Sequence, residues 1–184
     1  MAKATALIDA NNFYASCEQS LDPALQGRPV VVLSNNDGCI VARSAEARAL
    51  GIAMGTPFFQ ARRDLERLNV VVRSSNYALY ADMSQRLMSL LEQQAEDLEI
   101  YSIDEAFACL TRPVDGDLSG WARQLRARIK HNLGLPIAIG LGPSKSQAKL
   151  ANQLAKGIPT HAGVFDLGHC GDPDRWLETI AIED

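Results

Sequence analysis

Residues 99–110 have the sequence EIYSIDEAFACL, in which two adjacent carboxylates, Asp104 and Glu105, are flanked by apolar residues. The apolar residues at 100–103 and 106–110 predict two short strands, or one strand that the acidic pair interrupts. Removing a carboxylate from water costs several kcal/mol unless it is paired or bound to a cation. The pair therefore indicates either an acidic hairpin turn or a site for a cation.

A third carboxylate, Asp9, ends another apolar segment far away in the sequence. Residues 4–9 (ATALID) predict a buried strand that carries Asp9 at its C-terminal end, where α/β folds usually place their ligand sites. Oxygen ligands from two strands suit a pair of Mg²⁺ ions, with substrate phosphates and water completing each coordination shell. Two such ions can activate an attacking hydroxyl group and stabilise a leaving pyrophosphate. Together, Asp9, Asp104 and Glu105 predict a two-metal site.

The remaining apolar patterns place these strands in an α+β fold. Further strands are predicted at residues 30–33, 39–42, 70–72 and 137–141, and helices at residues 11–21, 44–50, 64–67, 121–133 and 144–156. A longer amphipathic helix begins at Tyr77. The order β-α-(insertion)-α-β-β-α-β-α predicts a ferredoxin-like core with a subdomain inserted at about residues 27–72. Near the end of the chain, we expect a weak strand from Val164 and a helix that begins at Asp172-Pro173.

The composition excludes several classes of protein. The chain has 184 residues and a formal net charge of −4, so it should not grip a nucleic-acid backbone by bulk charge alone. Its four cysteines form no CxxC pair and indicate neither a zinc site nor a disulfide framework. No apolar segment approaches the ~20 residues that span a bilayer, and no leader pattern is found at the N-terminus. We therefore expect a cytoplasmic protein that does not contact membranes.

Candidate anion contacts lie in two places. Residues 140–146 (GLGPSKS) predict a tight strand-to-helix turn whose exposed N–H groups favour anions. The turn is not a P-loop, because Ser144 stands where that motif needs a glycine before its lysine. The basic candidates are Lys149 and Lys156 on the helix that follows, and Arg43 and Arg48 in the insertion. Each of them either contacts a phosphate group or belongs to a solvated basic surface.

Five segments of the chain resemble the Y-family of translesion DNA polymerases, and more narrowly its UmuC branch, the catalytic subunit of bacterial DNA polymerase V. They are IDANNFYASCE (8–18), VVVLSNNDGCIVARS (30–44), SSNYALYADMS (74–84), EIYSIDEAF (99–107) and GLGPSKSQAKLAN (140–152). The resemblance implies a polymerase palm with a ferredoxin-like core and an inserted small α/β fingers subdomain. It also implies error-prone, template-directed deoxynucleotidyl transfer during the SOS response to DNA damage.

The same resemblance implies a role for each candidate carboxylate. Asp9, Asp104 and Glu105 match the catalytic palm carboxylates that hold two Mg²⁺ ions. Ala10 matches the position whose backbone carbonyl supplies an additional ligand to the nucleotide-bound ion. The implied metal ligands are therefore Asp9, Ala10, Asp104 and Glu105.

Three further residues match nucleotide contacts of the family. Tyr14 matches the steric gate, whose ring crowds a 2′-hydroxyl group and so excludes ribonucleotides. Arg48 matches the fingers arginine that contacts the triphosphate, and Lys156 matches the palm lysine that contacts it from the opposite side. Ala45 departs from the wider family, which commonly has a phosphate-contacting tyrosine there. One hydroxyl contact to the nucleotide is therefore expected to be missing.

The resemblance also implies domain boundaries and partners. The palm would comprise residues 1–11 and 76–164, the fingers residues 12–75, and residues 165–184 the start of a thumb or a linker. Family members continue into a thumb and a little finger, which are absent here, so we expect a portion of a longer protein that is inactive or weakly active alone. The substrates would be primer–template DNA and a dNTP. The implied protein partners are a UmuD-like dimer, a RecA-type recombinase filament and the sliding clamp.

Two alternative functions remain open on the sequence. A nucleotidyl cyclase also uses a two-metal palm on a ferredoxin-like core, although it usually carries its acids in a GGDEF-like hairpin, which this sequence lacks. The other alternative is a non-catalytic, truncated palm and fingers module that binds a partner. Analysis of the products formed from a labelled triphosphate would separate a polymerase from a cyclase.

Overall fold

Strand β1 (Lys3–Ala10) lies in the middle of a five-stranded sheet. It pairs antiparallel with β6 (Glu105–Thr111) on one side and with β7 (Ile137–Gly142) on the other. The outer strands are β5 (Asp97–Ile100), antiparallel to β6, and β8 (Val164–Asp166), parallel to β7. The order β5-β6-β1-β7 is that of a ferredoxin-like β-α-β-β-α-β sheet, to which β8 is added. The predicted ferredoxin-like core is confirmed.

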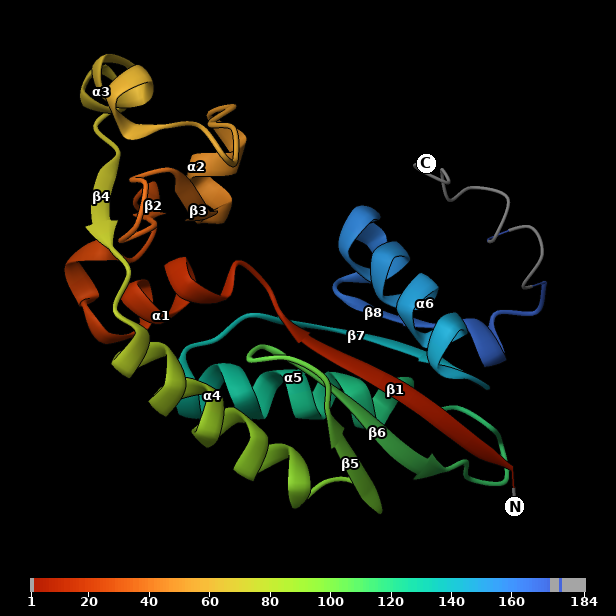
Figure 1. Cartoon of the computed structure of the whole chain (residues 1–184). Coiled ribbons are helices and arrows are strands. Elements are labelled where there is room, and N and C mark those ends of the chain that lie inside the picture. Colours follow the sequence, from red (N-terminus) through yellow and green to blue (C-terminus); the bar gives the residue numbers. More distant parts are fainter. Residues whose placement is uncertain (1, 173–175, 177–184) are drawn as a thin grey trace. The chain divides into compact units, whose positions relative to one another are not determined.

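This structure is a computed structural model that describes residues 2–172 and residue 176. The chain forms two compact units (Figure 1). Unit 1 comprises Met1–Ala10, Ser84–Asn132 and Pro136–Asp184, and unit 2 comprises Asn11–Met83 and Leu133–Leu135. The helix predicted to begin at Asp172-Pro173 lies outside the described residues apart from Asp172.

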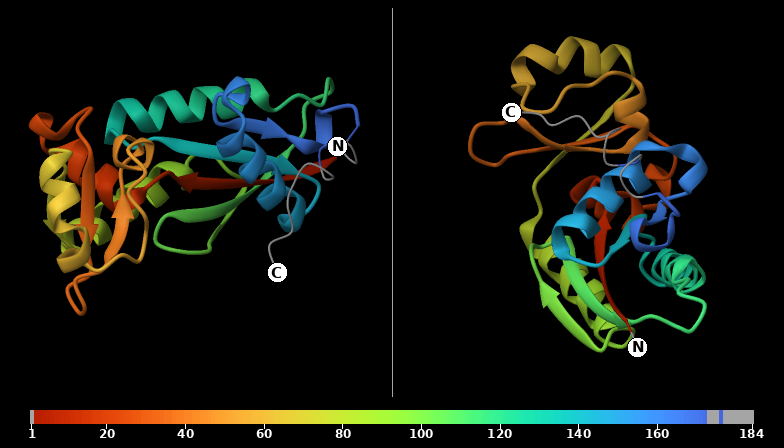
Figure 2. Two further views of the ribbon diagram at one scale, coloured as in Figure 1. Left: turned by 90° about the horizontal axis from the view of Figure 1, so that it is seen from above. Right: turned by 90° about the vertical axis from the view of Figure 1, so that its right-hand side faces the viewer.

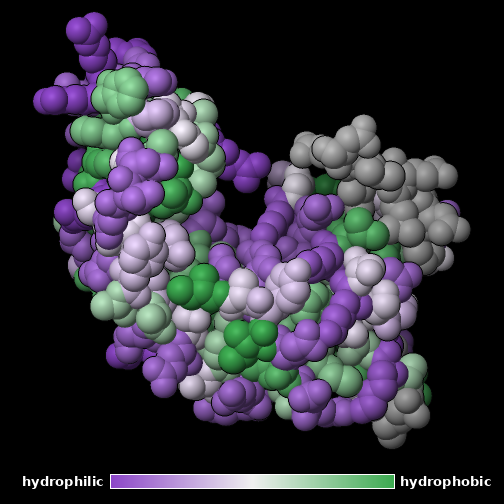
Figure 3. All heavy atoms as spheres, in the orientation of Figure 1, coloured by the Kyte–Doolittle hydropathy of each residue, from purple (hydrophilic) through white to green (hydrophobic). Residues whose placement is uncertain are grey.

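Helices cover both faces of the sheet of unit 1. Figure 2 shows the strands between α5 (Ser119–Leu133) on one face and α6 (Lys145–Gly157) on the other. Both faces of β1 are therefore covered, and every residue from Ala6 to Ala10 is buried. Short 3₁₀ helices η2 (Pro159–His161) and η3 (Leu167–His169) flank β8. At the surface over the β5–β6 hairpin, Figure 3 shows hydrophobic side chains, and Ile100 and Tyr101 are each more than half exposed there.

Unit 2 is built on a small three-stranded sheet. Strand β2 (Val30–Leu33) pairs antiparallel with β3 (Ile40–Arg43) and parallel with β4 (Val71–Ser74). The helical elements of this unit are α1 (Phe13–Leu21), η1 (Pro23–Leu25), α2 (Ala45–Ala49) and α3 (Phe58–Arg67). Helix α4 (Tyr77–Glu92) begins in unit 2 and continues into unit 1. The apolar core of the sheet includes Val31, Ile40 and Leu65.

Two predicted elements differ in extent from those observed. Helix α3 begins at Phe58, six residues before the predicted charged fragment, because Pro57 occupies its N-cap position and does not prevent the first turn. Strand β5 ends at Ile100, where the sequence predicted a strand over residues 100–103. The amides of Tyr101 and Ser102 both donate to the carbonyl of Glu105, at 3.0 and 3.1 Å, and this turn replaces the expected strand.

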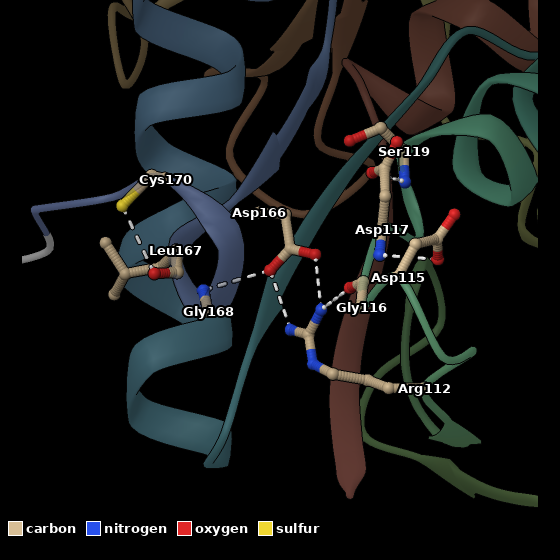
Figure 4. Close-up of polar contacts among 9 residues, drawn as sticks. All are labelled: Arg112, Asp115, Gly116, Asp117, Ser119, Asp166, Leu167, Gly168 and Cys170. Atoms are coloured by element: carbon tan, nitrogen blue, oxygen red, sulfur yellow. Dashed lines mark hydrogen bonds and ion pairs between the residues drawn. The ribbon is translucent and has the colours of Figure 1, made fainter.

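A buried ion pair fastens the last strand of unit 1 to the loop that follows β6 (Figure 4). The Arg112 guanidinium donates two hydrogen bonds of 2.7 Å to the two carboxylate oxygens of Asp166. It also donates to the carbonyl of Gly116 at 2.6 Å, and Asp166 accepts from the amide of Gly168 at 2.9 Å. The side chains of Arg112 and Asp166 are only 10% and 4% exposed, so this pair fixes β8 in the sheet.

A helix that crosses a bilayer must be long and mostly apolar. Within residues 2–172 and 176, no helix is both long and apolar enough to cross a membrane.

Candidate active site

The three candidate carboxylates lie together at one end of the β1–β6 pair. Asp9 is the penultimate residue of β1, and Glu105, the first residue of β6, is its direct partner in the register. Asp104 precedes Glu105, and its carbonyl oxygen accepts a 2.9 Å hydrogen bond from the amide of Ala10. Two segments that are almost a hundred residues apart in the sequence therefore deliver all three acids to one point in unit 1.

The pKa values of two of these acids, Asp104 and Glu105, are raised. Burial, the hydrogen bond to Asp9 and the negative charges of Asp9 and Asp104 together raise the pKa of Glu105 to about 7. Burial also raises the pKa of Asp104, although Ser102 opposes this by donating a 2.8 Å hydrogen bond to Oδ1 of the carboxylate. The cluster therefore concentrates more negative charge than its neighbours compensate, which is the electrostatic character of a cation site.

Lys156 is the positive group at this site. Its Nζ lies 2.6 Å from Oδ2 of Asp9, whose side chain is only 10% exposed. The Lys156 side chain is 37% exposed, so it is not closed off from solvent as Asp9 is. The lysine thus joins the carboxylates to the last turn of α6, and it could contact an anion that approaches the same acids.

Helix α6 is held against the sheet by a close backbone approach. A Cβ atom at Gly140 of β7 would lie 2.1 Å from the amide nitrogen of Asn152, so only glycine fits there. The Asn152 side-chain amide donates to the carbonyl oxygens of Leu7 and Ala138, at 3.3 and 3.1 Å. These contacts fix the height and rotation of α6 over β1 and β7, and so fix where Lys156 meets Asp9.

The residues present suit magnesium in their chemistry. Within residues 2–172 and 176, no group of three or more His, Cys, Asp and Glu side chains is already arranged to hold a metal ion, and Asp9 is paired with Lys156. Carboxylate and carbonyl oxygens are nevertheless the hard donors that Mg²⁺ prefers. A bound cation would also relieve the repulsion that raises the pKa of Asp104 and Glu105. The donor set therefore fits a divalent cation.

The other two predicted site residues, Tyr14 and Arg48, belong to unit 2. Tyr14 lies on α1, and its ring stacks on that of Tyr80 with centroids 4.3 Å apart and an interplanar angle of 12°. Arg48 is an exposed residue in the last turn of α2. The structure therefore brings Asp9, Asp104, Glu105 and Lys156 together in unit 1, and it places the other two residues in unit 2.

Two of the basic candidates are engaged within the fold. Arg43 donates a hydrogen bond from its guanidinium to the carbonyl oxygen of Ile52, which is a contact within unit 2. The Nζ of Lys149 lies 4.0 Å from the centroid of the Tyr101 ring, in a cation–π contact within unit 1.

Three residues that support the site were not predicted from the sequence. Ser102 holds Asp104, Asn152 holds α6, and Tyr80 stacks on Tyr14. A serine two positions before an aspartate is a weak local signal for a turn. Asn152 stands among the apolar positions of α6, which is a signal that its amide has a buried partner. No local pattern indicates the partner of Tyr80.

The sequence model of one protein family, described as impB/mucB/samB, matches residues 8–153. The chain belongs to this family. It is 49% identical over 181 residues to Protein UmuC of Salmonella typhimurium strain LT2, an alignment that covers 97% of the chain and 43% of that protein. It is also 49% identical over 164 residues to Protein SamB of Salmonella typhimurium, with 88% of the chain and 38% of that protein covered. The resemblance to the UmuC branch of the Y-family is confirmed.

A solved structure supports the same fold. The post-insertion binary complex of Dbh DNA polymerase superposes with a TM-score of 0.81 and 27% sequence identity, over 97% of this chain and 52% of that one. The predicted α+β fold, with a ferredoxin-like palm and an inserted α/β subdomain, is thereby confirmed for this member of the impB/mucB/samB family. The chain spans less than half the length of the curated relatives that it matches.

Proposed function

We propose that this chain carries the catalytic centre of an error-prone translesion DNA polymerase of the UmuC type. The observation that carries the proposal is the convergence of Asp9, Asp104 and Glu105 at one end of the β1–β6 pair, beside Lys156. The reaction is the transfer of a deoxynucleoside monophosphate from a dNTP to the 3′-hydroxyl group of a primer on a DNA template. The names of the relatives and of the superposed Dbh DNA polymerase support it.

Asp9, Asp104, Glu105 and the carbonyl group of Ala10 would hold two Mg²⁺ ions. Once bound, the ions supply Lewis-acid activation of the primer hydroxyl and stabilisation of the leaving pyrophosphate. The fold holds these carboxylates in place before any ion binds. The strand register fixes Asp9 and Glu105, and a hydrogen bond from Ser102 fixes Asp104. Preorganised charge of this kind is usually the largest contribution to phosphoryl transfer.

The basic residues and Tyr14 would bind the nucleotide. Lys156 and Arg48 would neutralise the triphosphate as charge moves toward the leaving pyrophosphate. Tyr14 would crowd a ribose 2′-hydroxyl and so select deoxyribonucleotides. Ala45 offers no hydroxyl group at its position, so the phosphate contact that a tyrosine makes there in the wider family is missing.

Units 1 and 2 would be the palm and the fingers. We propose a palm of residues 1–11 and 76–164 and fingers of residues 12–75, with residues 165–184 leading toward a thumb. The two compact units support this division, although they differ from it by assigning residues 11, 76–83 and 133–135 to unit 2 and residues 165–184 to unit 1.

The proposed setting is the bacterial cytoplasm, where primer–template DNA and dNTPs are the substrates. By family membership alone, we extend the proposal to three protein partners: a UmuD-like dimer, a RecA-type recombinase filament and the sliding clamp. Pull-down of each purified partner with the full-length protein tests this extension.

The catalytic role of the carboxylates is tested by Asp104→Asn in the full-length protein. The exchange keeps the shape of the side chain, so the melting temperature and DNA binding should remain unchanged while primer extension falls by at least about 1,000-fold. Asp97→Asn, which changes an exposed carboxylate on the neighbouring strand β5, is the matched control and should retain full activity. Primer extension by Asp104→Asn at the wild-type rate would contradict the proposal.

A further inference from the structure

Tyr80 connects two side chains on the same face of α1. Its ring, which is fully buried, stacks nearly parallel on the ring of Tyr14 at 4.3 Å. Its hydroxyl group donates a 2.9 Å hydrogen bond to Oε1 of Glu18. Tyr14 and Glu18 are four residues apart in α1 and therefore project from one face of the helix. Tyr80 thus contacts the first of these residues with its ring and the second with its hydroxyl group.

Glu18 is itself held from a third element of unit 2. Its side chain is 14% exposed, and Oε2 lies 3.9 Å from Nε of Arg73 on β4. Arg73 also pairs with Asp22 through a 3.2 Å contact that does not involve Tyr80. Side chains from β4 and from the first turn of α4 therefore both contact the Glu18 carboxylate of α1. Burial raises the pKa of Tyr80, so its hydroxyl group stays protonated and remains a hydrogen-bond donor to this carboxylate.

A residue that selects against one hydroxyl group must be held in a fixed position. The Tyr14 ring cannot move or tilt toward Tyr80 unless Tyr80 moves with it, because the two rings are stacked at 12°. The hydroxyl end of Tyr80 in turn cannot move away from α1 without breaking its hydrogen bond to Glu18, and the surrounding fold restricts its fully buried ring. The ring of Tyr77 meets both of these rings edge-on, with centroids 6.2 Å apart, and closes the cluster on another side.

This inference rests on the proposed function, in which Tyr14 selects the sugar of the incoming nucleotide. We propose that Glu18 and Tyr80 are positioning residues for that selection. They touch neither substrate nor metal, and they act by fixing the ring of Tyr14. Loss of the Tyr80–Glu18 hydrogen bond should therefore lower the preference for deoxyribonucleotides while the incorporation of dNTPs changes little.

The test compares single-nucleotide insertion of a dNTP and of the matching rNTP by the full-length protein. Tyr80→Phe keeps the stacked ring and removes only the hydroxyl group, and Glu18→Ala removes the acceptor. Each variant should reduce the kcat/KM for the dNTP divided by that for the rNTP roughly tenfold. A misplacement of about 1 Å at a reacting contact can lower a rate by up to about 100-fold. The double variant should be no worse than either single one, because both break the same hydrogen bond.

Two further variants separate positioning from general damage. Glu18→Gln retains an oxygen that accepts from Tyr80 and should restore most of the sugar preference. Asp22→Asn disturbs the other ion pair of Arg73 and should leave the preference unchanged. Thermal melting of every variant identifies unfolding, which would lower both insertion rates together and leave their ratio unaltered.

Tyr14→Ala and the wild-type protein are included so that the two proposals fail separately. If the wild-type protein does not extend a primer, or if Tyr14→Ala leaves the sugar preference intact, the proposed function or its gate assignment is overturned and this inference falls with it. If Tyr14→Ala lowers the preference but Tyr80→Phe and Glu18→Ala do not, only the positioning role is overturned.

Discussion

Glu105 faces Asp9 across the β1–β6 pair, and its carboxyl group is partly removed from water. In the unfolded chain, the same group would have its ordinary pKa of 4.5. The folded protein raises this pKa to about 7, so between these values the folded state binds a proton that the unfolded state releases. The free energy of unfolding of the metal-free chain should therefore decrease as the pH rises through this window.

The corresponding prediction concerns Glu105→Gln. In the presence of a chelator, the wild-type chain should lose stability between about pH 4.5 and pH 7, and the variant should show a much flatter profile. Urea denaturation at a series of pH values measures both profiles. Added Mg²⁺ should reduce the loss, because a cation can take the place of the proton among the carboxylates. Glu66→Gln, at an exposed position on α3, is the control, and a variant profile as steep as the wild type would contradict the prediction.

Arg112 gives a second prediction at this scale. Arg112→Met would leave the Asp166 carboxylate buried without its ion pair, and we expect a loss of about 3–5 kcal/mol in the free energy of unfolding. Removing both charges in Arg112→Met/Asp166→Leu should recover part of that loss. The control is Arg67→Met, whose partner Asp64 is exposed, and this change should cost at most about 1 kcal/mol. Equal effects of the Arg112 and Arg67 changes in denaturation experiments would refute this account.

At the scale of the elements, the close packing of α6 against β7 requires a residue without a Cβ atom at position 140, which is Gly140. Gly140→Ala would place a Cβ atom 2.1 Å from the backbone of Asn152, and α6 would have to move away from β7. We expect a loss of about 1–3 kcal/mol in stability from overpacking, and a weaker contact between Lys156 and Asp9. Denaturation and the KM for the dNTP in the full-length protein measure the two effects.

Gly120→Ala is the matched control for this change. Gly120 lies in α5, and a Cβ atom there would meet no neighbour within 4 Å. Alanine should therefore leave the fold intact or stabilise it by about 0.4–1 kcal/mol, because it reduces the entropy of the unfolded chain. If Gly140→Ala proved equally harmless, α6 would not be positioned by the close approach that we describe.

The elements also show how far a sequence can be interpreted alone. The strands that carry Asp9 and Glu105 were predictable, because continuous apolar runs that end in a carboxylate leave few other arrangements. The first turns of α3 were not, since Pro57 and the glycines before it suggest a break where the structure has an N-cap. The partners of Tyr80 and Asn152 could not be identified, because Glu18 and Leu7 lie 62 and 145 residues away from them in the sequence.

At the scale of the whole molecule, the charge of the chain limits what it can bind. Its formal net charge is −4, and its candidate site concentrates three carboxylates. Nucleic-acid binding depends mainly on Lys and Arg groups that neutralise phosphates. Beside these carboxylates, Lys156 is the basic group of the proposed site, and one lysine suits a single triphosphate better than a long stretch of duplex.

The prediction at this scale is weak DNA binding by the 184-residue chain. At about 0.15 M salt, its Kd for primer–template DNA should be weaker than about 10⁻⁵ M, and processive primer extension should be barely detectable. Fluorescence anisotropy with a labelled duplex measures the first quantity, and a gel-based extension assay the second. Nanomolar binding or long products from these 184 residues alone would contradict this prediction, because units 1 and 2 would then grip DNA by themselves.

The sheet of unit 1 ends in its two shortest strands, Asp97–Ile100 on one side and Val164–Asp166 on the other. Short edge strands leave few unpaired backbone N–H and C=O groups with which a second chain could pair. Asp97 and Glu99 would also confront their own copies if two β5 strands met side by side. The protein should therefore resist growth into amyloid-like fibres when it is concentrated or stored.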